Sequence, residues 1–245
     1  MYIPKSMEVT DLSKQLDLIR AHPLGTLFNY NAPNSSLISY FTGAGSADEA
    51  QVDGEMCCTH VPFLVVQEDD GTVKLTAHMA AKNQHVQMLR NNPRCLVVFQ
   101  AADSYITPSW YPLKEKTHKF VPTWDFAAVH VYGEAKIIND KEWLVDMISR
   151  LTDQEEGKRP EDEDAGAPGK RWKVSDAPAK YIEKRLDEVV GLEITVTNIQ
   201  GKFKLQQDMS EINVHGVLQG LEREVDNSVS EELIRLCKEN NPKAS

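Results

Sequence analysis

The 245-residue sequence predicts an α+β protein, built mainly on antiparallel strands with helices around the sheet. Three observations support this class. Strand-length apolar runs alternate with short amphipathic helices, an Asp-Gly pair marks a tight hairpin turn, and the 41% hydrophobic and 26% charged composition is that of a globular chain. Because the α+β pattern continues to the end, we expect a single domain over residues 1–245.

The N-terminal part is predicted to contain one helix and two extended segments. Asp11 is a suitable N-cap for residues 12–21, where apolar side chains recur at helical spacing. Apolar runs at residues 24–30 and 36–41 predict strands, and the small and polar residues 43–54 predict a loop.

A hairpin is predicted next, because two strand-like runs flank the Asp-Gly turn. The strands are residues 57–67 and 72–77, and the turn is residues 68–71. A short helix at residues 80–91 and a buried strand at residues 95–100 follow.

The middle of the chain combines a long strand, a helix and a charged segment. Residues 126–138 predict the strand, and Asp140 is the N-cap of a helix that reaches Leu151. Residues 153–171 mix charges with Pro and Gly and have no apolar periodicity, which predicts a charged surface loop.

The last third continues the same pattern. Residues 178–190 predict a helix and residues 191–203 a strand. A helical C-terminal extension over residues 209–240 is predicted in two pieces, residues 211–221 and 230–238, and a partner or a second subunit can pack there.

The formal net charge is −10, from 37 acidic and 27 basic residues. This charge repels phosphate backbones, and no basic run is long enough for a DNA-binding surface, which argues against direct DNA binding. No stretch approaches the ~20 apolar residues of a membrane span, and the N-terminus lacks the apolar core of a signal peptide. We therefore expect a cytoplasmic protein with no membrane partner.

Motifs for metal binding and for hydrolysis are absent from the sequence. The seven His residues are scattered, without Cys-x-x-Cys or His-Glu-x-x-His spacing, so no metal site is predicted. There is no Gly-x-Ser-x-Gly elbow, Walker loop or Gly-x-Gly-x-x-Gly. The adjacent Cys57 and Cys58 are interpreted as core or strand packing.

The turn at residues 75–83 gathers polar and cationic side chains where a strand is predicted to meet a helix. Free backbone N–H groups and the positive end of the helix dipole favour a phosphate at such a turn. Side chains that can add hydrogen bonds are Thr76, His78, Lys82 and Asn83. An ordinary capped helix is the alternative interpretation.

Two segments rich in aromatic residues and Pro, residues 105–112 and 121–126, form a second concentration. Rings held in rigid turns offer a stacking surface for a flat ligand at little entropic cost. Ser109, Thr123 and Asp125 can contact the polar edge of a heterocycle. The alternative is a hydrophobic subunit interface, and both hold if the ligand binds between subunits.

A third candidate lies near the end of the last predicted strand. Lys202 and Lys204 alternate along it and therefore point to the same face, where they can meet a phosphate or a carboxylate. As solvated strand residues they need no function.

Taken together and in order, these segments resemble the PaiB-like family of FMN-binding negative transcriptional regulators. The resemblance covers nearly the whole chain, and the two Trp-containing segments are its most distinctive part. The segments that carry it are residues 1–4, 23–27, 59–62, 78–83, 105–112, 121–124, 129–133, 175–178, 191–194 and 201–205.

The resemblance implies an FMN-binding split β-barrel with peripheral helices, acting as a homodimer with FMN in a groove between subunits. It implies that the flavin phosphate lies near His78, Lys82 and Asn83. It also implies that the ring or ribityl chain is lined by Ser109, Trp110, Thr123 and Trp124, with contributions from Lys204 and Gln207.

The sequence departs from the pattern of the family at four positions and in one segment. Ala81 stands where an Arg is expected, which removes a bidentate phosphate contact. Asp125 replaces an expected Asn, Gln206 a Ser and Asp208 an Asn, and residues 153–171 are an insertion.

The resemblance implies a flavin- or ligand-responsive regulator without turnover. A flavin-dependent oxidoreductase, such as a flavin reductase or a relative of pyridoxamine phosphate oxidase, is the alternative, because the flavin itself carries that chemistry. His60 and His130 are candidate polar groups for it, or else core histidines. A haem-binding or haem-degrading split barrel with a His axial ligand is a further alternative.

Overall fold

The computed structural model describes residues 1–31, 56–159 and 171–244. Its strands are β1 (Glu8–Val9), β2 (Leu24–Tyr30), β3 (Met56–Pro62), β4 (Leu64–Gln67), β5 (Val73–Ala80), β6 (Arg94–Ile106), β7 (Thr123–Ile138) and β8 (Val189–Lys204). Its α-helices are α1 (Leu12–Ala21), α3 (Gln84–Asn91), α4 (Lys114–Thr117), α5 (Lys141–Gly157), α6 (Ala179–Leu186), α7 (Glu211–Glu224) and α8 (Asn227–Asn240).

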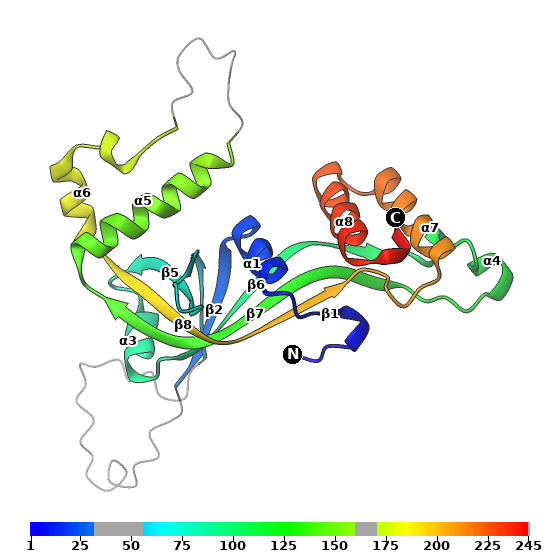
Figure 1. Cartoon of the computed structure of the whole chain (residues 1–245), viewed down its shortest axis with the longest axis horizontal. Coiled ribbons are helices and arrows are strands. Elements are labelled where there is room, and N and C mark those ends of the chain that lie inside the picture. The colour runs from blue at the N-terminus through cyan, green and yellow to red at the C-terminus, as the bar shows by residue number, and fades with distance from the viewer. Residues whose placement is uncertain (32–55, 160–170, 245) are drawn as a thin grey trace, which may run out of the picture. The chain divides into compact units, whose positions relative to one another are not determined.

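The strands form one 8-stranded sheet in the order β3-β2-β6-β7-β8-β5-β4, with β1 paired to β8 (Figure 1). The pairings β2–β3, β4–β5, β5–β8 and β1–β8 are antiparallel. Within the described residues the strand path ends at β3 and β4 without closing on itself. This agrees with the predicted α+β class, in which antiparallel strands dominate.

The chain divides into two compact units. Unit 1 comprises Met1–His22, Val98–His130 and Ile199–Ser245, and unit 2 comprises Pro23–Val97 and Val131–Asn198. The long strands β6, β7 and β8 contribute residues to both units. The single domain expected from the sequence stays a prediction.

Unit 1 is built on the part of β8 that pairs with β1. Gly201 faces Val9 there, and a Cβ on Gly201 would lie 2.9 Å from the Val9 carbonyl oxygen, so glycine permits the close approach. The Asp11 carboxylate accepts the Ser13 N–H and begins α1, as predicted. α1 buries Leu16 and Ile19, while α7 and α8 pack against each other.

Unit 2 contains the predicted hairpin, whose turn is formed by Gly71 at a φ of 85°. β4 and β5 pair from Gln67 opposite Val73 to Leu64 opposite Thr76. Helix α5 packs on these two strands. Its Trp143 ring lies directly against Gly191 in β8, where a Cβ would clash with the ring.

Several predicted boundaries move for identifiable reasons. The long run at residues 57–67 divides into β3 and β4 at the buried Phe63, whose N–H bonds to the Pro23 carbonyl. β5 extends to Ala80, so α3 begins at Gln84 rather than at residue 80. The predictions for residues 36–41 and 43–54 lie outside the described residues.

The predicted loop at residues 153–171 was wrong over its first five residues, which complete helix α5. Two basic residues just beyond the helix end pair back onto its last turn, Lys158 with Glu155 and Arg159 with Glu156. These pairs favour the last turn although it continues beyond the buried residues of the helix. Residues 160–170 lie outside the described residues.

The four cysteines divide by position rather than forming one buried group. Cys95 and Cys237 are buried, Cys57 is half-buried and Cys58 is exposed. β3 ends the strand path, and its side chains alternate in exposure. The strand interpretation of the Cys57-Cys58 pair is therefore confirmed, and the core interpretation is wrong for Cys58.

In the part of the chain that the structure describes, no helix is both long and apolar enough to cross a membrane.

Candidate functional site

The predicted anion-binding turn lies in unit 2 and uses two of its four polar side chains internally. Thr76 is buried in β5 and its hydroxyl donates to the Leu64 carbonyl at 3.5 Å. The Asn83 side chain accepts the His85 N–H at 2.9 Å and so caps α3. Lys82 is exposed and has no hydrogen-bond or ion-pair partner among the described residues.

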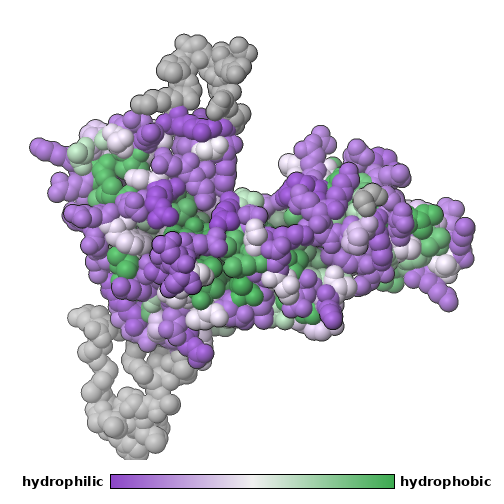
Figure 2. Space-filling model, viewed as in Figure 1, coloured by the Kyte–Doolittle hydropathy of each residue, from purple (hydrophilic) through white to green (hydrophobic). Residues whose placement is uncertain are grey.

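His78 lies within β5 rather than at the end of a strand. Its Nδ1 is buried and has no hydrogen-bond partner among the described residues, and burial lowers its pKa, which favours the neutral ring. The ring faces a hollow of about 160 Å³ lined by apolar side chains of α5 and α6, including Ile148 and Ile182. Figure 2 shows hydrophobic side chains at the surface beside these helices.

Trp110 and Ser109 lie in unit 1, in a short 3₁₀ turn, Pro108–Trp110. Trp110 is 7% exposed, and its indole N–H donates to the Glu224 carboxylate at 3.1 Å. A Cβ on Gly220 of α7 would clash with the ring, so the glycine makes room for it. This packing explains Trp110 without a ligand, whereas Ser109 is exposed.

Trp124, at the start of β7, is exposed together with Tyr105 at the end of β6. Their exposed fractions are 50% and 48%, and the ring centroids lie 6.1 Å apart in an edge-to-face arrangement. The Trp124 indole N–H donates to Asp103 at 2.6 Å, which fixes the orientation of the ring. These two rings offer an ordered aromatic surface to a flat molecule.

Lys204 brings a cation to this aromatic surface. Its Nζ donates to the Thr123 hydroxyl and to the Trp124 carbonyl, both at 2.5 Å, and lies 3.7 Å from the Asp125 carboxylate. The side chain is 24% exposed, so the ammonium remains within reach of a ligand. The structure thus brings together three of the predicted residues: Thr123, Trp124 and Lys204.

Asp125 is the buried end of the same group of residues. It is 3% exposed, and both carboxylate oxygens accept hydrogen bonds from the Gln206 amide, at 2.6 and 2.7 Å. The Tyr111 hydroxyl donates to the Gln206 carbonyl oxygen at 3.0 Å. Burial raises the pKa of Asp125 to about 6, while Gln206 and Lys204 oppose that shift.

Sequence reasoning missed this network, although it noticed two of its members. Asp125 and Gln206 both stand where the resemblance implies other residues, and the structure shows that they contact each other. The two residues are 81 positions apart, so no local pattern links them. Tyr111 gave no separate signal, because it lies in a segment dominated by other aromatic residues.

Gln207, also predicted to contact the ligand, is used by its own turn. Its amide oxygen accepts the Leu205 N–H at 2.8 Å and its amide N–H donates to the Phe203 carbonyl at 2.6 Å. Both contacts hold the chain as it leaves β8. The side chain therefore stabilises the turn that carries Gln206.

We call the surface formed by Tyr105, Thr123, Trp124, Asp125, Lys204 and Gln206 the strand-end cluster. It combines ordered aromatic rings, one partly exposed ammonium and one buried carboxylate. Such a surface suits a flat ligand that carries an anionic group. The other two histidines considered lie elsewhere: His60 is exposed on β3 and His130 is half-buried on β7.

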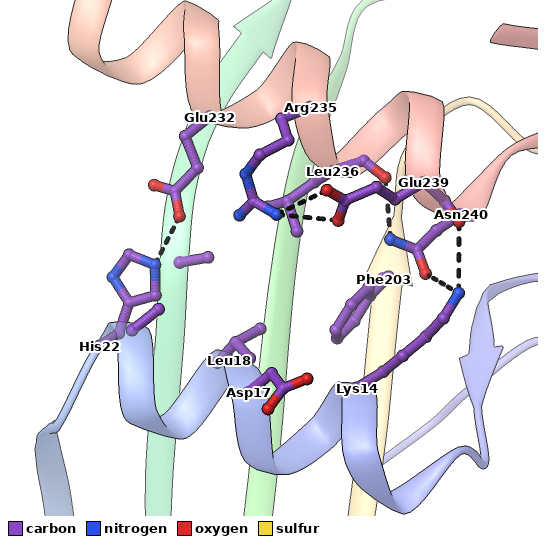
Figure 3. A pocket seen from close by; sticks show the side chains of 12 residues that line it. Lys14, Asp17, Leu18, His22, Phe203, Glu232, Arg235, Leu236, Glu239 and Asn240 are labelled. Carbon is purple, nitrogen blue, oxygen red and sulfur yellow. Dashed lines mark hydrogen bonds and ion pairs between the residues drawn. The ribbon is translucent and has the colours of Figure 1, made fainter. Parts of the chain in front are cut away.

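Unit 1 also has a hollow, of about 430 Å³, which lies between α1 and α8 (Figure 3). The His22 ring meets the Glu232 carboxylate at 2.5 Å at one end, and Lys14 donates to Asn240 at 2.9 Å at the other. Arg235 pairs with Glu239 between them. The contacts of His22 and Lys14 tie the α1 end of the chain to α8, whereas the Arg235–Glu239 pair lies within α8. The charged groups are therefore accounted for by contacts within the protein.

Among the described residues, no three or more His, Cys, Asp or Glu side chains come together in a way that could hold a metal ion.

Comparisons with known proteins place the chain among flavin-related folds. The family model described as "Putative FMN-binding domain" matches residues 1–198. The uncharacterized protein YKL070W of Saccharomyces cerevisiae is 52% identical over 173 residues, which are 70% of this chain and 100% of that protein. Protease synthase and sporulation protein PAI 2 of Bacillus subtilis is 27% identical over 224 residues, covering 91% of this chain and 90% of that protein.

Solved structures give the fold. The FAD and heme binding protein of Mycobacterium smegmatis superposes with a TM-score of 0.53 at 14% identity, covering 81% of this chain and 73% of that one. A conserved hypothetical protein of Mycobacterium tuberculosis, Rv2991, gives 0.51 at 15% identity, covering 85% and 94%. The predicted split-barrel fold is confirmed. The chain belongs to the FMN-binding domain family whose model matches it, as the resemblance to PaiB-like proteins implied.

Proposed function

We propose that this protein binds FMN with the strand-end cluster as part of the site. The observation that carries the proposal is the exposed, ordered pair of Trp124 and Tyr105 beside the Lys204 ammonium. FMN joins a flat tricyclic ring to an anionic phosphate, so an aromatic surface with an adjacent cation matches both of its parts. When bound, FMN supplies hydride- and electron-transfer chemistry.

The surface-accessible residues are the ones we assign to ligand contact. Trp124 would meet the ring, and Lys204 and Thr123 would offer donors. For Lys82, which lies in unit 2, contact with a ligand phosphate stays a separate prediction. The other predicted residues support their surroundings: Thr76, Asn83, Trp110 and Gln207 use their polar atoms on neighbouring protein groups.

We infer a homodimer, and the exposure of the aromatic pair supports this inference. Small-molecule sites bury about 70–90% of the ligand surface. A ring stacked on Trp124 and Tyr105 in one chain would keep its other face in water, because about half of each side chain is open to solvent. A second copy of the chain, placed over this surface, would cover the ligand.

The role we propose is that of a flavin-responsive regulator. The polar side chains of the strand-end cluster bond to one another, so their positions are fixed before a ligand binds. The net charge of −10 opposes binding to phosphate backbones. Regulation would therefore act through a protein partner or a metabolite rather than through direct contact with DNA.

A flavin-dependent oxidoreductase is the second candidate, favoured by one observation. Asp125 is a buried carboxyl group whose pKa, raised to about 6, lies close to neutral pH. Such shifts are typical of groups that exchange protons during catalysis. Oxidation of NADH or NADPH by the FMN-loaded protein would support this role, and its absence would favour the regulator.

The experiment that tests FMN binding is the visible spectrum of the purified protein, followed by acid release of any chromophore and titration with FMN. We expect flavin bands and released FMN, whereas a haem Soret band or a protein that cannot be loaded would contradict the proposal. Trp124→Ala should weaken FMN binding by about 0.5–1.5 kcal/mol, the usual worth of an aromatic pair. Trp172→Ala is the matched control, because Trp172 is an exposed tryptophan that is not among the residues assigned to ligand contact.

A further inference from the structure

Asp125 is nearly inaccessible, yet only one cation faces it among the described residues. That cation is Lys204, whose Nζ lies 3.7 Å away and is shared with two other oxygen atoms. The other titratable groups that act on the carboxyl group are the Tyr111 hydroxyl and the Cys237 thiol of α8. A buried carboxylate with a single, shared cation is costly to keep ionised.

The Gln206 backbone indicates that this arrangement is maintained at a cost. Its φ is 65°, in the left-handed region that residues other than glycine rarely adopt. Such a conformation persists where surrounding contacts hold it, and it is concentrated at functional sites. The contacts here are the two amide bonds to Asp125 and the bond from Tyr111, so the backbone serves to aim the amide at the carboxylate.

We propose that Asp125 is a positioning residue that sets the charge which Lys204 presents to an anionic group of the ligand. This inference rests on the proposed flavin site. The ionised carboxylate neutralises the ammonium, which Thr123 and the Trp124 carbonyl hold in place. When Asp125 takes a proton, the pair gains a net positive charge, and this charge attracts the anionic group of the ligand.

The direction of the effect with pH follows from the groups around the carboxyl group. Burial raises the pKa of Asp125 to about 6, that of Tyr111 to about 12 and that of Cys237 to about 11. Between pH 5 and pH 8, Tyr111 and Cys237 therefore keep their protons while Asp125 loses its own. Anion binding at Lys204 should weaken as the pH rises through this range.

A purely structural network would behave differently. Asp125→Asn keeps the size of the side chain and one acceptor oxygen for Gln206, while it removes the charge and replaces the other acceptor by an NH2 donor. The exchanged acceptor does not titrate between pH 5 and pH 8, so only the lost charge can change the pH dependence. If the carboxylate merely ties β7 to the turn after β8, this change alters stability but not the pH dependence of binding. If the carboxylate sets the charge of Lys204, the pH dependence is lost.

The test is titration with FMN at several pH values from 5 to 8, on the wild type, Asp125→Asn and Lys204→Met. Quenching of the flavin fluorescence measures the binding. The phosphate of FMN titrates in the same range, so the ratio of wild-type to Asp125→Asn affinity at each pH is the quantity to compare. We expect equal affinities at pH 5 and about tenfold weaker binding by the wild type at pH 8, the effect of a coupling of one pKa unit. Lys204→Met should bind weakly at every pH.

A second measurement needs no ligand. The ¹³C carboxyl shift of Asp125 reports its protonation directly, and we expect its midpoint to rise further in Lys204→Met, because the neighbouring cation favours the ionised form. Lys204→Arg keeps the charge and should retain the wild-type direction of the pH effect. Circular dichroism on each variant shows that the fold is intact.

The outcomes separate this inference from the proposed function. Two outcomes overturn the inference without contradicting the FMN site. One is parallel pH profiles of binding for the wild type and Asp125→Asn. The other is a titration midpoint of the Asp125 carboxyl group that is the same in the wild type and in Lys204→Met. Failure of all three proteins to bind FMN at every pH overturns the FMN site and the inference with it.

Discussion

At the scale of single residues, the buried carboxyl group of Asp125 links the pH to the stability of the fold. Its pKa is about 6 in the folded chain, against 3.8 for an aspartate that is open to solvent. The folded state therefore binds this proton more tightly than the unfolded state. The stabilisation is fully present below about pH 4 and is lost as the pH rises through 6.

We expect Asp125→Asn to gain stability over the wild type as the pH rises from 5 to 7.5. The variant has no buried charge to lose stability as the pH rises. The difference in free energy of unfolding between Asp125→Asn and the wild type should therefore widen by about 1–3 kcal/mol, because each pKa unit corresponds to about 1.4 kcal/mol. Urea unfolding of both proteins at several pH values measures it. Stability curves that stay parallel across this range would contradict the assignment.

Lys82 gives a second prediction at this scale. It is exposed and without a partner among the described residues, so a ligand phosphate would meet an uncommitted cation. Lys82→Ala should weaken FMN binding by about 1–3 kcal/mol through loss of a charge-assisted hydrogen bond. Lys180→Ala, at an equally exposed lysine of α6, is the control, and equal affinities in calorimetry would remove Lys82 from the site.

At the scale of elements, helix α7 is positioned by the contact of its glycines with Trp110. A Cβ on Gly220 would clash with the indole ring, and one on Gly216 would clash with the Trp110 carbonyl oxygen. These close approaches fix the helix on the turn that carries Ser109. Steric contact therefore links the position of α7 to the conformation of the turn that contains Trp110.

Gly220→Ala should therefore destabilise the protein even though alanine favours helices. We expect a loss of about 1–3 kcal/mol from overpacking against the ring. Gly157→Ala is the matched control at the end of α5: nothing lies within 4 Å of its added Cβ, so the change should be neutral or should add up to about 1 kcal/mol. Thermal unfolding compares the two, and equal melting temperatures would show that α7 can shift.

At the scale of the whole molecule, the aromatic surface of the strand-end cluster leads to a prediction about assembly. We expect a particle of twice the 27.6 kDa of one chain in light scattering after size exclusion, since a second copy would cover the exposed rings. Trp124→Asp should shift the population toward the single chain, because it places a charge in the apolar centre of the contact. A wild-type protein with a measured mass of 27.6 kDa across the whole elution peak would contradict the homodimer.

The sequence by itself determined the elements whose signals are local. α1 and β2 have the predicted bounds because the cap at Asp11 and the stop before Pro23 act on neighbouring residues. Boundaries moved where the deciding contact was remote. β5 continues beyond its predicted end because it pairs with β8 as far as Ala80, which lies opposite Val189. No local sequence pattern reveals this pairing.

The candidate site divides in the same way. Residue types singled out Thr123 and Lys204, and the resemblance to the family added Trp124. Only the tertiary structure decided that Trp110 is packed under α7 and that Asp125 meets Gln206, 81 residues along the chain. Burial, charge pairing and the pKa shifts that follow from them depend on which distant segments come together, and a linear pattern does not contain that information.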